Sequence, residues 1–481
     1  MKTKKMVNSE IHIHGLWLRK HAFFTVFLLA IGLWYGSSLL VFHDPWWDSS
    51  VYIGMGKYIW SLGEAGLWEP ARPLVWPMLL GFLWKMGLDP LFWGQVITIL
   101  FSLGIVFFTY LIGSSLWPRK VAFFGAFFTA LFPIYFSFVN ILHAEIPSLF
   151  FLMLSLYFII RGRFAFAGFF SGLSFLARFY QLFSIIGIIS FMIFIIVKQY
   201  KTKNKKKLKE VWKNLVLFLV PFLILAALYL IANVFLYGNP FYPFLLQAYL
   251  TMNTGEMSAR PFVFYFIELF LQNPLIPFAL LGILYSLRMK EKNAILLVSV
   301  FLFSFIPYLF VAHKELRLVI AVIPLLSLLI SLGFITFIGK LKMSKYLVFF
   351  SGILLWSFLA LPQLEFSAYE DGLDAFYGYS KNIPESHMLL ISNPSFIVHT
   401  DRKADLLYYP RYGTSAINAF TGHIDEYDDV LMNSCDLLPC HAEDKGCAAR
   451  HLEFIDLLKK SHKVQYEQNV GGCEHIILGR K

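Results

Sequence analysis

Long apolar runs recur along most of this chain, and they constrain its fold more than any other feature. A membrane-spanning helix needs about 20 mostly apolar residues. Eleven runs reach or approach this length: 21–42, 90–112, 121–141, 146–160, 164–177, 180–197, 214–236, 263–287, 293–312, 317–338 and 345–361. Only 15% of the 481 residues are charged, whereas soluble domains carry about 25%. We therefore expect residues 1–361 to form an all-α polytopic membrane protein with about eleven transmembrane helices.

The basic residues predict how these helices are oriented. Eight Lys lie between Lys198 and Lys213, and short loops rich in Lys and Arg stay in the cytoplasm. With the N-terminus also cytoplasmic, the inside loops hold 23 basic residues and the outside loops seven. The net charge of +11 is thus a topology signal or a lipid headgroup contact rather than a sign of nucleic acid binding.

This orientation requires that residues 73–88 do not cross the membrane. The run is about 16 residues long and contains a Pro and Lys85, so we expect a juxtamembrane or re-entrant helix. The first outer loop then covers residues 43–89 and is the largest loop between two spans.

Residues 362–481 differ in composition from the rest. Charged residues return, and apolar runs shorten to strand length, as in HMLLIS and EHIILG. We expect a small extracytoplasmic α/β domain. All four cysteines, Cys435, Cys440, Cys447 and Cys473, lie here. An outside location favours disulfides, for which three pairings are open; free thiols, or a metal site with His441, are the alternatives.

Ionisable residues gather at the outer edges of the spans, where burial near hydrocarbon is costly. The set is Asp44, Asp48, Glu64, Glu69, Arg72, His143, Glu145, Arg178, Arg260, His313, Lys314, Glu315 and Arg317. Taken singly, Arg178 and Lys314 could be interfacial anchors and Glu145 an exposed loop residue. Packed together, the set would form a polar cavity open to the outside. Its cations could hold a phosphate, and a carboxylate could accept a proton from a hydroxyl group.

Several short motifs occur in these places. They are D-x3-Y at Asp48–Tyr52, ARPL at Ala71–Leu74, ALFPIYFSFVNILHAEIP at Ala130–Pro147, FAGFFSGLSFLARF at Phe166–Phe179 and HKELRL at His313–Leu318. Together they resemble the GT-C glycosyltransferases, integral membrane enzymes that use polyprenyl-phosphate sugars. HKELRL is similar to the HKExRF motif of the dolichyl-phosphate-mannose-dependent mannosyltransferases, with Leu318 in place of Phe. The resemblance covers about residues 20–335.

The resemblance implies a role for each polar residue. Asp48 would be the general base, with Asp44 as its rival. The donor phosphate would be bound by Arg72, Arg178, Lys314 and Arg317. The acceptor or the sugar would be oriented by His143, Glu145, His313 and Glu315. Trp47 could stack on a sugar ring, although a Trp at the membrane interface is commonly an anchor. The chemistry requires no metal, but Asp48 and Glu145 could bind a divalent ion.

The expected activity is transfer of a hexose, mannose above all, from a polyprenyl-phosphate-sugar donor to a glycan, lipid or protein acceptor, with inversion. An oligosaccharide or protein O-glycosyl transferase of the same fold is one alternative. A lipid or sugar transporter is another, although transporters place charges near mid-membrane and often show internal repeats. The protein would lie among membrane lipids, in a prokaryotic cell membrane or the endoplasmic reticulum membrane, with its active site on the extracytoplasmic side.

Overall fold

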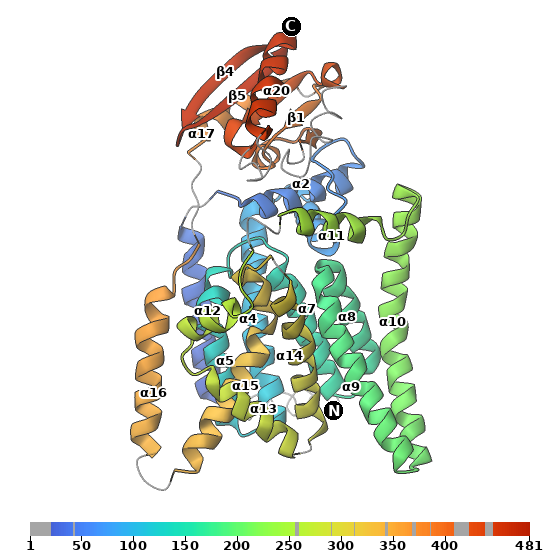
Figure 1. Cartoon of the computed structure of the whole chain (residues 1–481), viewed down its shortest axis with the longest axis vertical. Helices are drawn as coiled ribbons and strands as arrows, with labels where there is room; N and C mark the ends of the chain where they lie inside the picture. The colour runs from blue at the N-terminus through green and yellow to red at the C-terminus, as the bar shows by residue number, and fades with distance from the viewer. Residues whose placement is uncertain are drawn as a thin grey trace, which may run out of the picture.

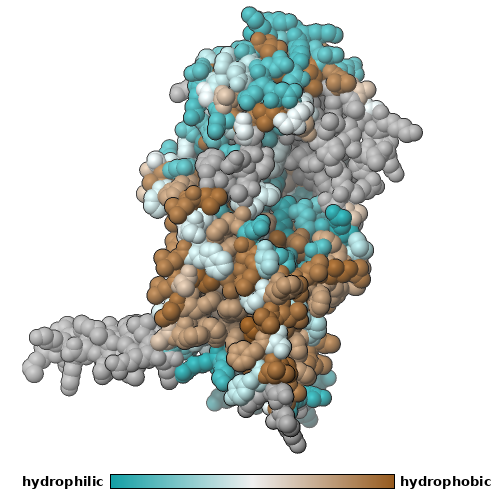
Figure 2. Space-filling view, turned by 90° about the vertical axis from the view of Figure 1, so that its left-hand side faces the viewer, coloured by the Kyte–Doolittle hydropathy of each residue, from teal (hydrophilic) through white to brown (hydrophobic). Residues whose placement is uncertain are grey.

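The structure is a computed structural model that describes residues 21–41, 44–254, 259–289, 291–311, 313–341, 345–367, 372–384, 386–407, 423–437 and 446–481. A helical body and a small sheet domain are stacked along the long axis, with α2 (Trp47–Ser61) between them (Figure 1). On the face that Figure 2 shows, the body is largely hydrophobic and the sheet domain largely hydrophilic. This division is the one expected for a membrane part and an aqueous part.

Each of the eleven apolar runs is mostly helical where the structure describes it, but the described residues contain fewer helices of spanning length than the eleven expected. Seven helical segments of the described residues are long and apolar enough to cross a membrane: His21–Leu40, Pro90–Leu116 (α4), Phe179–Lys201 (η2 and α9), Lys205–Tyr237 (α10), Lys292–Phe310 (α14), Leu316–Gly339 (η3 and α15) and Tyr346–Gln363 (within α16 and η4). Two shorter apolar helices are α7 (Glu145–Ile160) and α8 (Phe164–Ala177). α15 is almost wholly buried inside the bundle, whereas α10 and α16 lie at its flanks and expose apolar side chains.

Two of the expected spans are interrupted by prolines. Residues 121–141 divide into α5 (Arg119–Ala130) and α6 (Pro133–Ser137), and residues 263–287 into α12 (Phe264–Gln272) and α13 (Pro277–Met289), which are bent by 99°. Phe132 and Asn273 both precede a proline and adopt extended backbone, because proline disfavours the helical region for the residue before it. The side chain of Gln272 accepts a hydrogen bond of 3.0 Å from the Ile134 N–H, so the two breaks lie together.

The first outer loop folds into two helices above the bundle. α3 (Val75–Lys85) has 11 residues, fewer than a span requires. α2 packs closely on it through Gly56 and Gly81: a Cβ atom on Gly56 would lie 2.6 Å from the Gly81 nitrogen. α11 (Tyr242–Thr254) follows α10 and lies near α2, at the end of the body that faces the sheet domain (Figure 1).

The C-terminal domain is built on a five-stranded sheet with the order β2-β1-β3-β5-β4. Its strands are β1 (Leu389–Ile391), β2 (Ala404–Leu406), β3 (Asp429–Asn433), β4 (His462–Val470) and β5 (Cys473–Arg480), with helices α17 (Asp374–Ser380), α18 (Ser395–Val398) and α20 (Cys447–Ser461). β1 pairs in parallel with β2 and β3, while β5 pairs antiparallel with β3 and β4. This mixed sheet with helices confirms the α/β domain.

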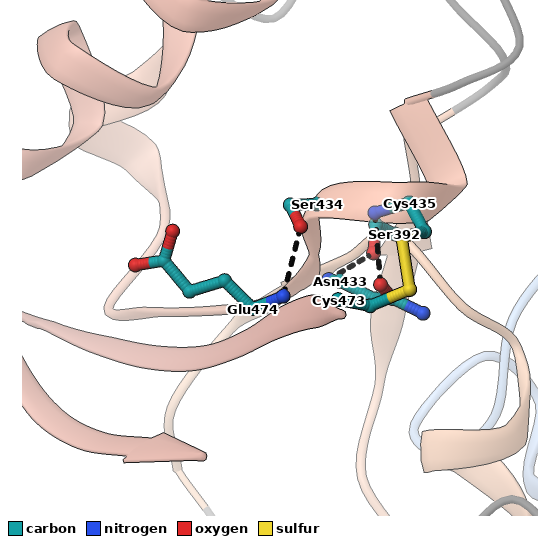
Figure 3. Close-up of a disulfide and its surroundings, with 6 residues drawn as sticks. All are labelled: Ser392, Asn433, Ser434, Cys435, Cys473 and Glu474. Atoms are coloured by element: carbon teal, nitrogen blue, oxygen red, sulfur yellow. Dashed lines mark hydrogen bonds between the residues drawn. A yellow bond between two sulfur atoms is a disulfide. The ribbon is translucent and has the colours of Figure 1, made fainter. Parts of the chain in front are cut away.

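One disulfide joins Cys435, in the 3-10 helix η7 (Ser434–Leu437) that follows β3, to Cys473, the first residue of β5 (Figure 3). It confirms that at least one pair of cysteines is oxidised in this domain. Cys440, His441 and the side chain of Cys447 lie outside the described residues.

The sheet domain is fixed directly to α2. Val51 and Met55 of α2 share a hydrophobic core with Phe376, Phe396 and Ile397 of the sheet domain. The buried ammonium of Lys57 donates hydrogen bonds to the carbonyls of residues 397, 398 and 400 at 2.9, 3.1 and 2.9 Å and pairs with Asp401 at 2.8 Å. The sheet domain therefore holds the helix whose first turn contains Asp48.

Candidate active site

Asp48 lies in the first turn of α2, at the boundary between the helical body and the sheet domain. A carboxylate in this position is favoured by the positive end of the helix dipole. Two guanidinium groups hold it. Arg72 Nη2 lies 2.7 Å from Oδ1, and Arg317 Nη1 lies 2.5 Å from Oδ2. Each oxygen of the carboxylate thus has its own cation.

These two arginines determine the ionisation of Asp48. Burial by itself would raise the pKa of Asp48, but the charges of Arg72 and Arg317 outweigh burial and hold that pKa well below its ordinary value. In the structure as it stands, Asp48 is therefore a stable anion and a weak base.

Arg317 also connects Asp48 to the HKELRL segment. Its Nε donates to Glu315, whose other oxygen pairs with His313 Nε2 at 2.7 Å. Burial would raise the pKa of Glu315, but the hydrogen bond from His313 and the charge of Arg317 lower it to about 2. The segment runs into the 3-10 helix η3 (Leu316–Val322), which precedes α15 (Ile323–Gly339).

A second ion pair lies behind the first. Arg178, which follows α8, pairs with Glu145, the first residue of α7. His143 stands between the pairs: its Nδ1 is 3.5 Å from Arg317 Nη1 and 4.0 Å from Glu145 Oε2. Five segments that are distant in the sequence thus meet in one network of charges.

A cavity of about 440 Å³ opens beside Asp48. It is lined by Trp46, Trp47, Asp48, Ile134, Phe138, His143, Glu315, Leu316 and Arg317. Ligand sites typically measure about 300 to 1,000 Å³, so there is room for a sugar ring with its phosphate. The lining combines charged residues of the network with the aromatic side chains of Trp46, Trp47 and Phe138.

His143 is a neutral side chain at the edge of this cavity. Burial lowers its pKa to about 4. Its Nδ1 lies 3.5 Å from Arg317 Nη1 and accepts this hydrogen bond when the ring proton is on Nε2. Nε2 is buried and has no hydrogen-bond partner among the described residues. In that tautomer, His143 has an unused N–H group on Nε2.

The structure brings together most of the residues expected from the sequence. Asp48, Arg72, Arg317, His143, Glu145, Arg178, His313 and Glu315 form the network, and Trp47 lines the cavity. Lys314 is placed differently: its buried ammonium donates to the carbonyls of Arg260 and Val311 at 3.0 and 2.5 Å. In this arrangement the ammonium of Lys314 provides hydrogen bonds for backbone carbonyls in the region that precedes η3.

Some lining residues carried no sequence signal of their own. Ile134, Phe138 and Leu316 are apolar residues in apolar runs. Glu69 accepts a hydrogen bond of 3.0 Å from Arg72 Nε, which fixes that guanidinium toward Asp48. The sequence predicts Glu69 as one of the ionisable residues at the outer edges of the spans but assigns it no role.

We compared the chain with protein families, curated proteins and solved structures. No family model and no curated protein matches the chain. Among solved structures, ArnT from Cupriavidus metallidurans bound to undecaprenyl phosphate superposes with a TM-score of 0.61 at 11% identity, over 95% of this chain and 97% of that one. The Archaeoglobus fulgidus oligosaccharyltransferase tethered to an acceptor peptide gives 0.60 at 14% identity, over 96% and 74%. AglB from the same organism, with an inhibitory peptide and a dolichol-phosphate, gives 0.58 at 13% identity, over 96% of this chain and 74% of that one.

The chain has the GT-C fold. This confirms the resemblance carried by the motifs and the expected multi-pass membrane architecture. The superposition with ArnT covers nearly the whole of both chains, so the sheet domain is included in the likeness. Identities of 11 to 14% establish the fold and leave the substrate to be argued from the site.

A metal ion would need this network to rearrange. One structure of the Archaeoglobus fulgidus enzyme contains zinc and sulfate. In the described part of the present chain, no group of three or more His, Cys, Asp or Glu is arranged to hold a metal. Both Asp48 oxygens accept from arginines, and Glu145 pairs with Arg178. A divalent ion between Asp48 and Glu145 therefore requires these arginines to move away first.

Proposed function

We propose that this protein is a polyprenyl-phosphate-sugar-dependent glycosyltransferase that moves one hexose to an acceptor hydroxyl at the outer membrane face. The observation that carries the proposal is a carboxylate held by two arginines at a sugar-sized cavity, in the fold of ArnT and AglB. Mannose is the first sugar to test, because HKELRL is similar to a motif of mannosyltransferases.

The donor phosphate would compete with Asp48 for its cations. A phosphodiester offers two charged oxygens, as the carboxylate does, and guanidinium groups bind both kinds of anion. When the phosphate takes a guanidinium of Arg72 or Arg317, Asp48 loses that partner and its pKa rises toward the ordinary value. Donor binding would in this way turn a weak base into a stronger one.

Transfer would then be a single displacement. The acceptor oxygen forms a bond to the anomeric carbon while the bond from that carbon to the phosphate oxygen breaks. The hydroxyl proton passes to Asp48, and the polyprenyl phosphate leaves with the bonding electrons. Arg72 and Arg317 stabilise the charge that develops on the leaving phosphate. Attack from the face opposite the leaving group inverts the anomeric configuration.

The test is turnover by purified protein with a small panel of polyprenyl-phosphate sugars. A positioned general base contributes about 10² to 10⁴ in rate, so Asp48→Asn should lose at least about a hundredfold in turnover and still bind donor. Asp44→Asn should keep substantial activity, and exposed Glu64→Gln serves as the control. Near-normal turnover in Asp48→Asn with loss in Asp44→Asn would identify the other carboxylate as the base. Near-normal turnover in both variants would show that neither carboxylate of this loop acts as the general base.

Oligosaccharide transfer is the second candidate, and the match to the Archaeoglobus fulgidus oligosaccharyltransferase favours it. The panel should therefore include a lipid-linked oligosaccharide together with an acceptor peptide. Transfer of that glycan, with no transfer of single sugars, would replace the first proposal. Movement of an unchanged lipid across vesicles without sugar transfer would indicate a transporter.

A further inference from the structure

A second groove lies next to the cavity at Asp48. It has a volume of about 400 Å³ and shares Ile134 with that cavity. Its polar lining comes from three places: Ser137 on α6, Gln272 at the end of α12, and Gln363, Glu365 and Ser367 beyond α16. The groove thus forms where the two proline-interrupted segments, α5–α6 and α12–α13, lie near the residues that follow α16.

The amide groups in this groove are held in fixed positions. Gln272 is almost fully buried, and its Oε1 accepts from the Ile134 N–H. Its Nε2 has no partner among the residues that the structure describes. Gln363 Nε2 donates to the carbonyls of Leu271 and Leu359 at 3.0 and 2.7 Å, which leaves its Oε1 as an acceptor. One amide therefore offers a donor and the other an acceptor.

The remaining lining also suits a sugar. Phe366 is one apolar wall and is fixed by stacking on Phe136, with ring centroids 4.8 Å apart. Ser137 and Ser367 contribute hydroxyl groups, and Glu365 a carboxylate. Hydroxyl, amide and carboxylate groups exchange hydrogen bonds with sugar hydroxyls, and an aromatic face packs against the apolar face of a ring.

The two cavities differ in whether a cation lines them. Arg317 lines the cavity at Asp48, together with the carboxylates of Asp48 and Glu315. The groove lining, in contrast, contains one carboxylate and no Lys, Arg or His. A phosphate or carboxylate in the groove would face Glu365 without a compensating cation. The groove therefore selects against anions.

We propose that this groove is the acceptor subsite and that it takes a neutral, hydroxyl-rich glycan. This rests on the proposed function. The donor phosphate occupies the arginine side, and the acceptor approaches Asp48 past Ile134 from the groove. The sugar next to the reacting one lies against Phe366, between the amides of Gln272 and Gln363.

The test measures glycan binding directly and does not depend on transfer. Purified full-length protein is loaded with undecaprenyl phosphate and titrated with mannotriose, with binding followed by ligand-observed NMR. Ser367→Trp fills the groove, and Glu365→Ala removes its carboxylate. A hydrogen bond to a charged group accounts for about a tenfold change in affinity. Glu365→Ala should thus weaken mannotriose binding about tenfold, and Ser367→Trp should abolish it. Undecaprenyl phosphate should bind both variants as it binds wild type.

Controls distinguish a loss of mannotriose binding caused by the change in the groove from one caused by a general loss of folded protein. Glu467→Ala, an exposed residue on β4, should bind mannotriose as wild type does. A mannotriose phosphate ester should bind wild type more weakly than mannotriose. Absence of mannotriose binding to wild type, unchanged binding in Ser367→Trp, or preference for the phosphate ester would each overturn the assignment. Failure of sugar transfer in the donor panel, with groove binding as expected, would count against the proposed function alone.

Discussion

At the scale of the residue, Arg317 is the centre of the candidate site. One guanidinium contacts Asp48, Glu315 and His143. Its five N–H donors in a planar fork allow these simultaneous contacts, whereas the ammonium of a lysine presents a single point of charge. The same geometry suits a phosphate. We expect donor affinity to depend on Arg317 and on Arg72, the second cation on Asp48.

The first prediction concerns these arginines. Arg317→Ala or Arg72→Ala should weaken binding of a polyprenyl-phosphate donor about tenfold or more, because a hydrogen bond to a charged group contributes about 1.5 to 3 kcal/mol. The measurement is donor affinity in detergent, by fluorescence titration, on protein checked for folding. Arg161→Ala is the matched control, because Arg161 is exposed and its guanidinium lies over the ring of Tyr157, away from Asp48 in the sequence. Unchanged affinity in both site variants would assign the two arginines to interfacial anchoring.

The second prediction concerns His143 and pH. The ordinary pKa of this side chain, 6.5, is lowered by burial to about 4. Between these values the unfolded chain binds a proton here that the folded protein does not bind, so stability falls as pH falls. The paired carboxylates Asp48 and Glu315 have lowered pKa values, so their contribution is lost only below about pH 4.

The melting temperature should therefore decrease between pH 7 and pH 4.5 by more in wild type than in His143→Gln. Scanning calorimetry or a thiol-independent thermal shift in detergent measures the difference. Parallel pH profiles for the two proteins would mean that His143 gains its proton without cost in the folded state. The other histidines are common to both proteins and cancel in this comparison.

At the scale of the element, the position of α2 decides where Asp48 lies. Below, α2 rests on α3 through Gly56 and Gly81, and above, Lys57 holds it to the sheet domain. A Cβ atom at position 56 would meet the nitrogen of Gly81 and the carbonyl of Pro77, both at 2.6 Å. These are backbone atoms that no side-chain rotation can remove, so α2 itself must move.

The third prediction is that Gly56→Ala destabilises the protein by about 1 to 3 kcal/mol, the usual cost of overpacking, and lowers turnover by tilting the start of α2. Gly36→Ala is the control, because a Cβ at Gly36 meets nothing within 4 Å. Thermal unfolding and turnover are measured on both variants. Equal stability and equal turnover in the two would show that α2 and α3 can separate without consequence.

At the scale of the whole molecule, the charged site lies where the hydrophobic body meets the hydrophilic sheet domain (Figures 1 and 2). A site at this level can take a lipid-linked donor from the bilayer and an acceptor from the aqueous side. The Lys-rich stretch Lys198–Lys213 joins α9 to α10 at the opposite end of the body. The distribution of basic residues predicts that this end faces the cytoplasm.

The fourth prediction tests that orientation. In protein lacking Cys440 and Cys447, Lys206→Cys should resist a membrane-impermeant thiol reagent in intact cells and react after lysis. Glu467→Cys on β4 should react in intact cells. Mass spectrometry or a shift on gels reports the labelling. Reaction of Lys206→Cys from outside would invert the topology and place the site in the cytoplasm.

From the sequence we predicted the apolar helices, the strands in HMLLIS and EHIILG, and the set of ionisable residues at the ends of the apolar runs. These properties are local, since hydrophobic length and turn-forming residues act over one segment. The 99° bend between α12 and α13 was missed even though its prolines are visible, because hydropathy alone cannot tell a long span from a broken one.

Which of these charges contact each other depends on the tertiary structure. Arg317 and Asp48 are 269 positions apart, and Lys314, three residues before Arg317, bonds to backbone carbonyls instead. The groove at Gln272 likewise needs α6, α12 and the segment after α16 together. Charge pairing depends on distances set by helix packing, and packing is a property of all the segments at once, so no single stretch of sequence carries it.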